Sequence, residues 1–203
     1  MEYVHVAKSA IPRDLCEQII EKFERDPNKS RGKVGYGDIN DEVKKTIDLH
    51  YDYENDIEWK SIHRKLEMYF QIAFDEYTKY LYEKVTHNLV FDNLTRIETV
   101  RTGFQLQKYG VGDYFEWHID DLEAKKRIIT YIIYFNTLKK EDGGYTEFFN
   151  SKKVQPIAGN ILFFPSTWTY PHRGAPLKDK VKYIATGFIE EECFVTLPKT
   201  LSV

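Results

Sequence analysis

The chain has 203 residues, of which 42% are hydrophobic and 30% are charged. This composition excludes a disordered protein and predicts one domain, residues 1–203, with a single substantial core. The 29 basic and 32 acidic residues give a net charge of −3, so no sequence-wide positive field is available to bind a nucleic-acid backbone. We therefore expect no nucleic-acid partner.

Cysteine content and hydropathy bear on the cellular compartment. Cys16 and Cys193 cannot form a disulfide framework and are too few for a zinc site made of cysteines alone. The amino-terminal residues show no basic leader followed by an apolar run, and the chain contains no stretch of about eighteen apolar residues. These features predict a cytoplasmic protein that does not enter a membrane.

Helical periodicity dominates the first part of the chain. Pro12 is placed to open a helix, and Asp26-Pro27 is placed to end it. A loop-rich segment, 28–55, follows. A long amphipathic helix is expected over 56–84, where apolar residues recur at three- and four-residue steps: Ile62, Leu66, Phe70, Ala73, Tyr77 and Leu81. Residues 1–90 are thus predicted to form a mainly helical support.

After residue 88 the apolar period changes to that of strands. Residues 104–109 alternate, and residues 127–136 are almost continuously apolar, as in a strand that is buried on both faces. Asp142-Gly143-Gly144 is a turn signal before a strand at 145–149. Further strands are expected at 160–164 and 181–189, with Pro165 and Pro171 in the loop between them. This pattern predicts a sandwich or barrel over 91–192, in an α+β fold with the amino-terminal helices packed on one sheet.

Two of the six histidines begin a His-x-Asp triplet, at residues 50–52 and 118–120. Residues i and i+2 of a strand share a face, so either triplet could offer an imidazole and a carboxylate to one metal. Nothing downstream of the first triplet supplies a third ligand at strand spacing, which favours an ordinary loop residue at His50. The second triplet precedes strands, and a further histidine opens a later one. Two histidines and one carboxylate can bind ferrous iron and leave three positions open, with His118, Asp120 and His172 as the predicted ligands.

Lys182 begins an alternating run in which it shares a face with Ile184, Thr186 and Phe188. A cation at the inner end of an apolar face needs an anion beside it, and a dicarboxylate co-substrate would supply one. The alternative left open by the residues is that this lysine lies on the solvent side among its neighbours Lys178 and Lys180.

Three segments carry a resemblance to a known family. QLQKYGVGDYFEWHID looks like an approach to the first iron ligands, RIITYIIYFN followed by DGGYTEFF looks like a central strand and a double-glycine turn, and AGNILFFPSTWTYPHRGAPLKDKVKYIATGFI looks like a closing stretch with the distal histidine. Together they cover most of residues 97–190. They resemble the ferrous iron and 2-oxoglutarate-dependent dioxygenases, and within them the prolyl 4-hydroxylase-like branch.

The resemblance implies a double-stranded β-helix, or jelly-roll, core. It implies Fe(II), 2-oxoglutarate as co-substrate and O2, with ascorbate as a reductant. The implied reaction hydroxylates a prolyl or similar residue in a peptide or protein substrate and decarboxylates 2-oxoglutarate to succinate and CO2.

The resemblance also implies roles for individual residues. His118, Asp120 and His172 would bind iron, and Lys182 would pair with the distal carboxylate of 2-oxoglutarate. Further contacts to the co-substrate would come from Tyr109, Tyr134 and Thr186. Arg127 and Trp168 are candidates for substrate contact, with a surface cation and a packing role as their respective alternatives.

Two other functions stay open at this point. One is hydroxylation of a free amino acid or other small molecule, for which a more enclosed pocket is expected. The other is a non-catalytic jelly-roll module that binds a metal.

Overall fold

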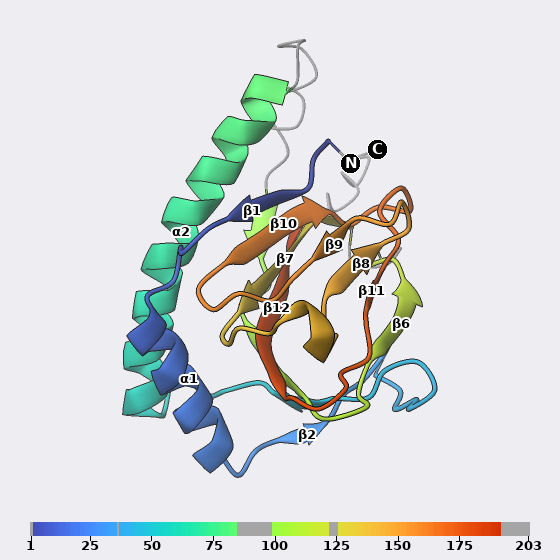
Figure 1. Ribbon diagram of the computed structural model, residues 1–203. Coiled ribbons are helices and arrows are strands. Elements are labelled where there is room, and N and C mark those ends of the chain that lie inside the picture. Colours follow the sequence, from blue (N-terminus) through green and yellow to red (C-terminus); the bar gives the residue numbers. More distant parts are fainter. Residues whose placement is uncertain (1, 36, 85–98, 122–125, 192–203) are drawn as a thin grey trace, which may run out of the picture.

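The computed structural model describes residues 2–35, 37–84, 99–121 and 126–191 of the chain (Figure 1). The elements are, in order, β1 (His5–Ala7), α1 (Arg13–Arg25), β2 (Ser30–Arg31), β3 (Ile47–Leu49), α2 (Ile57–Lys84), β4 (Thr99–Arg101), β5 (Gln105–Tyr109), β6 (Phe115–His118), β7 (Arg127–Tyr134), a short 3-10 helix (Lys140–Asp142), β8 (Thr146–Phe148), β9 (Lys153–Val154), β10 (Ile161–Pro165), β11 (His172–Gly174) and β12 (Lys182–Glu191).

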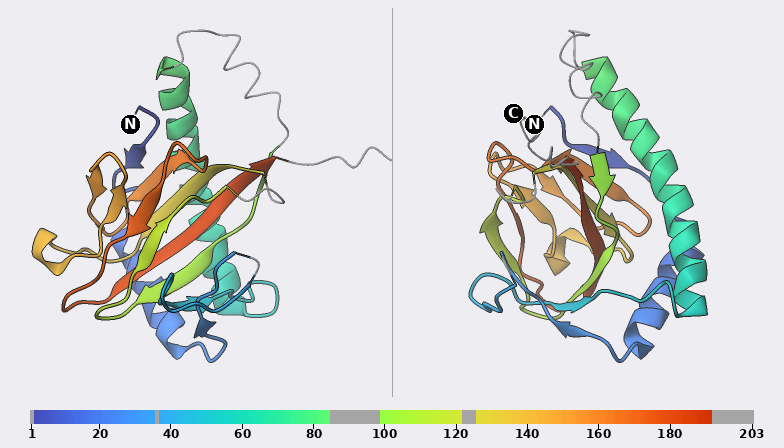
Figure 2. Two further views of the ribbon diagram at one scale, coloured as in Figure 1. Left: turned by 90° about the vertical axis from the view of Figure 1, so that its right-hand side faces the viewer. Right: turned by 180° about the vertical axis from the view of Figure 1, so that it is seen from behind.

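The strands form two antiparallel sheets. The larger sheet has the order β1-β10-β7-β12-β5-β3-β2, with β4 also paired to β12, and the smaller sheet has the order β6-β11-β8-β9. The two sheets face each other, and both helices lie on the outer side of the larger one (Figure 2). This is the predicted α+β fold with a jelly-roll core and amino-terminal helices packed on one sheet.

The two helices begin and end where the sequence predicts. α1 follows Pro12 and ends before Asp26-Pro27. The backbone N–H of Trp59 donates to Oδ1 of Asp56, which therefore caps the start of α2. The indole Nε1 of Trp59 donates to Oδ2 of Asp26 at 2.7 Å, and this bond joins the end of α1 to the start of α2.

The main core lies between the helices and the outer face of the larger sheet. Phe163 of β10 is fully buried and stacks on Tyr77 of α2 with ring centroids 5.0 Å apart. Phe70 of α2 contacts Tyr131 of β7 in a tilted arrangement, with ring centroids 4.5 Å apart. Aromatic pairs of this kind contribute beyond the area that they bury. The apolar stripe of α2 is therefore core, as its spacing predicts.

Several short strands were not predicted. The segment 28–55, expected to be loop-rich, contains β2 and β3, and β3 pairs with β5 through Leu49 and Leu106. β1 likewise joins the larger sheet beside β10, so the first ninety residues contribute strands as well as helices. Strands of two or three residues are too short to show a period of two, and pairing partners distant in sequence determine them.

Smaller differences concern single residues. Pro165 is the last residue of β10 and not a loop residue. Cys16 is a buried free thiol, and Cys193 lies outside the described residues. Neither described helix is both long and apolar enough to span a bilayer.

Candidate active site

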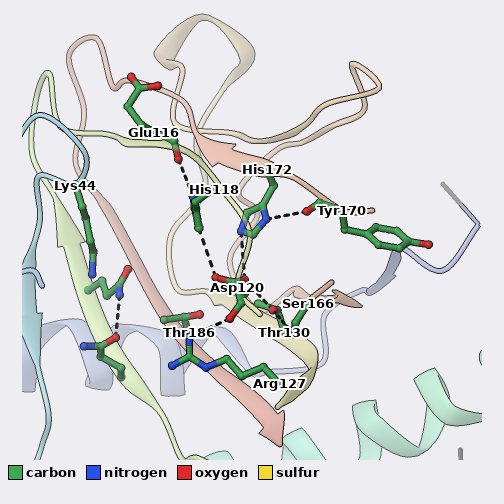
Figure 3. Close-up of polar contacts among 12 residues, drawn as sticks. Lys44, Glu116, His118, Asp120, Arg127, Thr130, Ser166, Tyr170, His172 and Thr186 are labelled. Atoms are coloured by element: carbon green, nitrogen blue, oxygen red, sulfur yellow. Dashed lines mark hydrogen bonds and ion pairs between the residues drawn. The ribbon is translucent and has the colours of Figure 1, made fainter. Parts of the chain in front are cut away.

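The three predicted metal ligands converge at one end of the smaller sheet. His118 ends β6 and lies directly opposite His172 of β11 in the antiparallel register. The sequence suggested that His118 and Asp120 belong to one strand. In the structure β6 ends at His118, and Asp120 reaches the histidines from the loop that follows. Its Oδ1 lies 3.5 Å from Nε2 of His118 and its Oδ2 lies 3.4 Å from Nε2 of His172 (Figure 3). One ligand atom from each residue falls within 4.8 Å of the others.

Hydrogen bonds orient each ligand toward this point. Nδ1 of His118 lies 2.6 Å from the carbonyl oxygen of Glu116, and Nδ1 of His172 lies 3.2 Å from that of Tyr170. Because a carbonyl only accepts, each Nδ1 carries the proton and each Nε2 presents its lone pair. The hydroxyl of Thr130 donates to Oδ2 of Asp120 at 2.8 Å.

The local electrostatics favour the protonation states that a metal requires. Burial lowers the pKa of His172 to about 4, so its imidazole is neutral at pH 7. Burial raises the pKa of Asp120, but the two histidines and Thr130 outweigh this and hold it well below its usual value. The neutral imidazole of His172 and the ionised carboxylate of Asp120 fit ferrous iron bound by two histidines and one carboxylate.

Lys182 supplies the second part of the site. Its side chain is buried, with 2% of the residue exposed, and its Nζ donates to the carbonyl oxygen of Gly144 at 3.0 Å and lies 4.0 Å from the ring centroid of Tyr109. Gly143 and Gly144 both have positive φ, which explains the double-glycine turn that presents this carbonyl.

No carboxylate in the part of the chain that the structure describes forms an ion pair with Lys182. Burial accordingly lowers its pKa to about 7. A buried ammonium group without a counter-ion is costly unless an anionic ligand joins it. Lys182 therefore fits the distal carboxylate of 2-oxoglutarate.

The remaining predicted co-substrate contacts line the same cavity as Lys182. The hydroxyl of Tyr109 donates to Oε1 of Gln107 at 3.1 Å, and that of Tyr134 lies 2.7 Å from Oγ1 of Thr146. The hydroxyl of Thr186 donates to the carbonyl oxygen of Tyr131 at 3.3 Å. All three hydroxyls have hydrogen-bond partners within the ligand-free chain, and a bound co-substrate would replace these partners.

A single cavity of about 890 Å³ contains the metal ligands and Lys182. Arg127 also lines it, with Nη1 3.2 Å from the carbonyl oxygen of Asp120 and its guanidinium 3.6 Å from the ring centroid of Phe188. Trp168 is 75% exposed and is not among the described cavity-lining residues, so the structure does not bring it to the metal.

Part of the cavity wall was missed in the sequence. Lys44, His50 and Tyr53 line it, although they come from the segment predicted to be a loop. Gln105 and Gln107 also line the cavity. The strand alternation in the sequence indicated this, because both residues share the face of Tyr109.

Comparisons with solved structures agree with this fold. The chain is similar to a prolyl 4-hydroxylase from Pseudomonas putida, with a TM-score of 0.68, 16% identity and 94% of each chain covered. It is also similar to a viral collagen prolyl hydroxylase from Paramecium bursaria Chlorella virus-1 in complex with 2-oxoglutarate, with a TM-score of 0.64, 15% identity, and 94% of this chain and 97% of that chain covered.

A third similar structure is a prolyl hydroxylase from Trichoplax adhaerens in complex with a peptide fragment of the oxygen degradation domain of hypoxia inducible factor. The TM-score is 0.72 at 15% identity, with 94% of this chain and 84% of that chain covered. No curated protein sequence matches the chain. Residues 104–190, which include the three converging ligands and Lys182, match the family model of the 2OG-Fe(II) oxygenase superfamily. Residues 104–190 are therefore a 2OG-Fe(II) oxygenase domain by sequence, and the chain has the fold of the prolyl 4-hydroxylases.

Proposed function

We propose that this oxygenase hydroxylates a prolyl or similar residue in a peptide or protein. In the proposed reaction 2-oxoglutarate is oxidised to succinate and CO2, and O2 provides one oxygen atom to succinate and one to the new hydroxyl group. The observation that carries the proposal is that the three converging ligands and Lys182, which has no described carboxylate partner, share one cavity.

The residues of this chain have distinct tasks in the proposed reaction. His118, Asp120 and His172 would hold Fe(II), which together with 2-oxoglutarate supplies the activation of O2. Lys182 would bind the distal carboxylate and so orient the co-substrate toward the metal ligands. The side chains of Ile132 and Ile184 line the cavity and would limit the access of water to it.

The outer part of the cavity favours a peptide over a small enclosed substrate. Its rim includes the exposed residues Lys33, His50 and Tyr53, so it opens to solvent. Arg127 lines the same cavity beside Asp120, where its guanidinium would donate to a carbonyl group of a bound peptide chain. Trp168, exposed on the loop before β11, would contact a more distant part of the same peptide. The similar structure from Trichoplax adhaerens was solved with a peptide.

The test is incubation of the purified chain with Fe(II), 2-oxoglutarate, ascorbate and a panel of proline-containing peptides. We expect succinate to form, and we expect mass spectrometry to show the gain of one oxygen atom on a prolyl residue. Free proline and other free amino acids are assayed in parallel. Succinate formation that is stimulated by a free amino acid and by no peptide would contradict the peptide assignment and favour a small-molecule hydroxylase.

A further inference from the structure

The cavity side of β5 carries a continuous chain of polar side chains. The hydroxyl of Tyr109 donates to Oε1 of Gln107 at 3.1 Å, and Nε2 of Gln107 donates to Oε1 of Gln105 at 3.1 Å. Nε2 of Gln105 then donates to Oδ2 of Asp48 at 3.3 Å. Gln107 is buried, with 4% of the residue exposed, as is Tyr109 at 3%. These four residues, Tyr109, Gln107, Gln105 and Asp48, are called the relay below.

The direction of the relay follows from its far end. A carboxylate accepts hydrogen bonds and donates none, so the nitrogen of the Gln105 amide must face Asp48. The same nitrogen lies 2.9 Å from Nε2 of His50, which accepts its second proton when the imidazole is neutral with the proton on Nδ1. Two acceptors therefore hold the Gln105 amide in one orientation. Its oxygen faces Gln107, which leaves only the oxygen of the Gln107 amide for the Tyr109 hydroxyl.

Asp48 is itself firmly anchored. Nζ of Lys44 lies 2.7 Å from its Oδ2, and the hydroxyl of Thr46 donates to its Oδ1 at 2.7 Å. The side chains of Lys44 and Asp48 are both only 3% exposed. A buried ion pair with a third hydrogen bond holds the carboxylate in place. The fold therefore sets the direction of the whole relay before any ligand arrives.

A tyrosine hydroxyl has a single proton to donate. In the relay this proton is committed to Gln107. Nζ of Lys182 lies 4.0 Å from the centroid of the Tyr109 ring. A carboxylate bound at Lys182 would compete for the same proton. When the hydroxyl turns to the carboxylate, Oε1 of Gln107 loses its buried donor, and this loss opposes binding.

We propose that Gln107 is a positioning residue that lowers the affinity for 2-oxoglutarate by competing for the Tyr109 proton, with Gln105 and Asp48 setting the direction of that competition. The inference rests on the proposed binding of 2-oxoglutarate between Lys182 and Tyr109. It concerns the affinity for 2-oxoglutarate, which residues other than the metal ligands would adjust.

The experiment is a double-mutant cycle on 2-oxoglutarate binding, measured by calorimetry with the Mn²⁺-loaded protein in the absence of oxygen, so that no turnover is needed. Gln107→Met removes the competing acceptor at similar size, and we expect about fivefold tighter binding, which corresponds to one hydrogen bond. Tyr109→Phe removes the proton itself. In the Tyr109→Phe background, we expect Gln107→Met to leave the affinity unchanged, because nothing remains for it to compete over.

Two further variants keep the test decisive. Gln105→Met interrupts the relay, leaves Gln107 in the sequence and frees the Gln107 amide to turn, so it should also tighten the binding of 2-oxoglutarate. If circular dichroism shows that Gln107→Met does not fold, Gln105→Met decides the test. Gln71→Met is the matched control, because this exposed glutamine of α2 donates to Oδ1 of Asp75 outside the relay and should leave the affinity unchanged.

The outcomes separate the inference from the proposed function. Weaker or unaltered binding in the two relay variants, or the same change with and without the Tyr109 hydroxyl, overturns the inference and leaves the proposed function in place. A wild-type chain that binds Mn²⁺ but not 2-oxoglutarate overturns both.

Discussion

The two faces of the larger sheet are built from alternating residues of the same strands, yet they have opposite characters. On β5, Leu106 faces the helices and Gln107 faces the cavity, with 2% and 4% of each residue exposed. On β12, Ala185 and Lys182 differ in the same way. Burial alone thus does not separate core from site. The outer face is apolar and closely packed, whereas the inner face holds polar groups, among them Lys182, which forms no ion pair with a carboxylate of the described residues.

This contrast has an energetic consequence. Residues of the outer face stabilise the fold through buried apolar area, which requires no ligand. Lys182 on the inner face is stabilised only when an anion joins it. Substitutions in the cavity and on the outer face are therefore expected to separate stability from activity, and three of them test this separation.

The largest expected effect is in the cavity, which the inner face lines together with residues of the smaller sheet. His172→Ala removes one of three converging ligands, and we expect 2-oxoglutarate turnover to fall to background, measured as succinate formed. The circular dichroism spectrum should stay that of a folded chain. His5→Ala is the matched control, because this histidine of β1 contacts Tyr80 and Glu76 away from the metal ligands. Turnover that survives in His172→Ala would remove this residue from the metal site.

The outer face should respond in the opposite way. Phe163→Ala leaves a cavity among Phe70, Phe74 and Tyr77, and we expect the free energy of unfolding to fall by about 3–5 kcal/mol in urea titrations. The activity per folded molecule should not change. Ile72→Ala serves as the control, since this residue of α2 is 62% exposed and its loss should have little effect. A specific loss of activity without destabilisation would break the comparison between the faces.

Lys182→Met should change affinity and stability in opposite directions. Without the ammonium group, we expect calorimetry to show at least about 30-fold weaker binding of 2-oxoglutarate. The ligand-free protein should melt at a higher temperature, because an unpaired buried charge has been replaced by an apolar side chain. Lys180→Met, at an exposed position, should alter neither quantity. If the ligand-free variant is instead less stable, the Lys182 ammonium group has a partner within the fold that stabilises it.

The smallest expected effect is a dependence on pH. The pKa of Lys182 is lowered from its ordinary value of 10.5 to about 7 by burial, so between these values the unfolded chain binds a proton that the folded chain does not. Its contribution to stability should therefore rise with pH across that window and be at its lowest below pH 7. The measurement is the difference in unfolding free energy between wild type and Lys182→Met at several pH values.

The same shift predicts proton uptake when 2-oxoglutarate binds above pH 7. Calorimetry in two buffers with different ionisation enthalpies measures that uptake, which should disappear in Lys182→Met. A difference between wild type and variant that does not vary with pH would show that Lys182 keeps its ordinary pKa in the fold.

Much of this protein is determined by sequence patterns that act over short distances. The three- and four-residue apolar spacing of α2, the Asp26-Pro27 stop after α1 and the alternation of β5 each depend on local geometry, so they were predictable. The resemblance over residues 97–190 supplied the order of His118, Asp120, His172 and Lys182 along the chain. The order of these residues along the chain does not determine the distances between their side chains.

Only the tertiary structure decided how those residues meet. β6 and β11 become neighbours through pairing between distant segments, and the same kind of pairing places β3, which contains Asp48, next to β5. The direction of the relay and the missing counter-ion of Lys182 follow from these long-range contacts. A single strand shows which side chains share a face, but what lies opposite that face depends on closure of the two sheets, which no local pattern encodes.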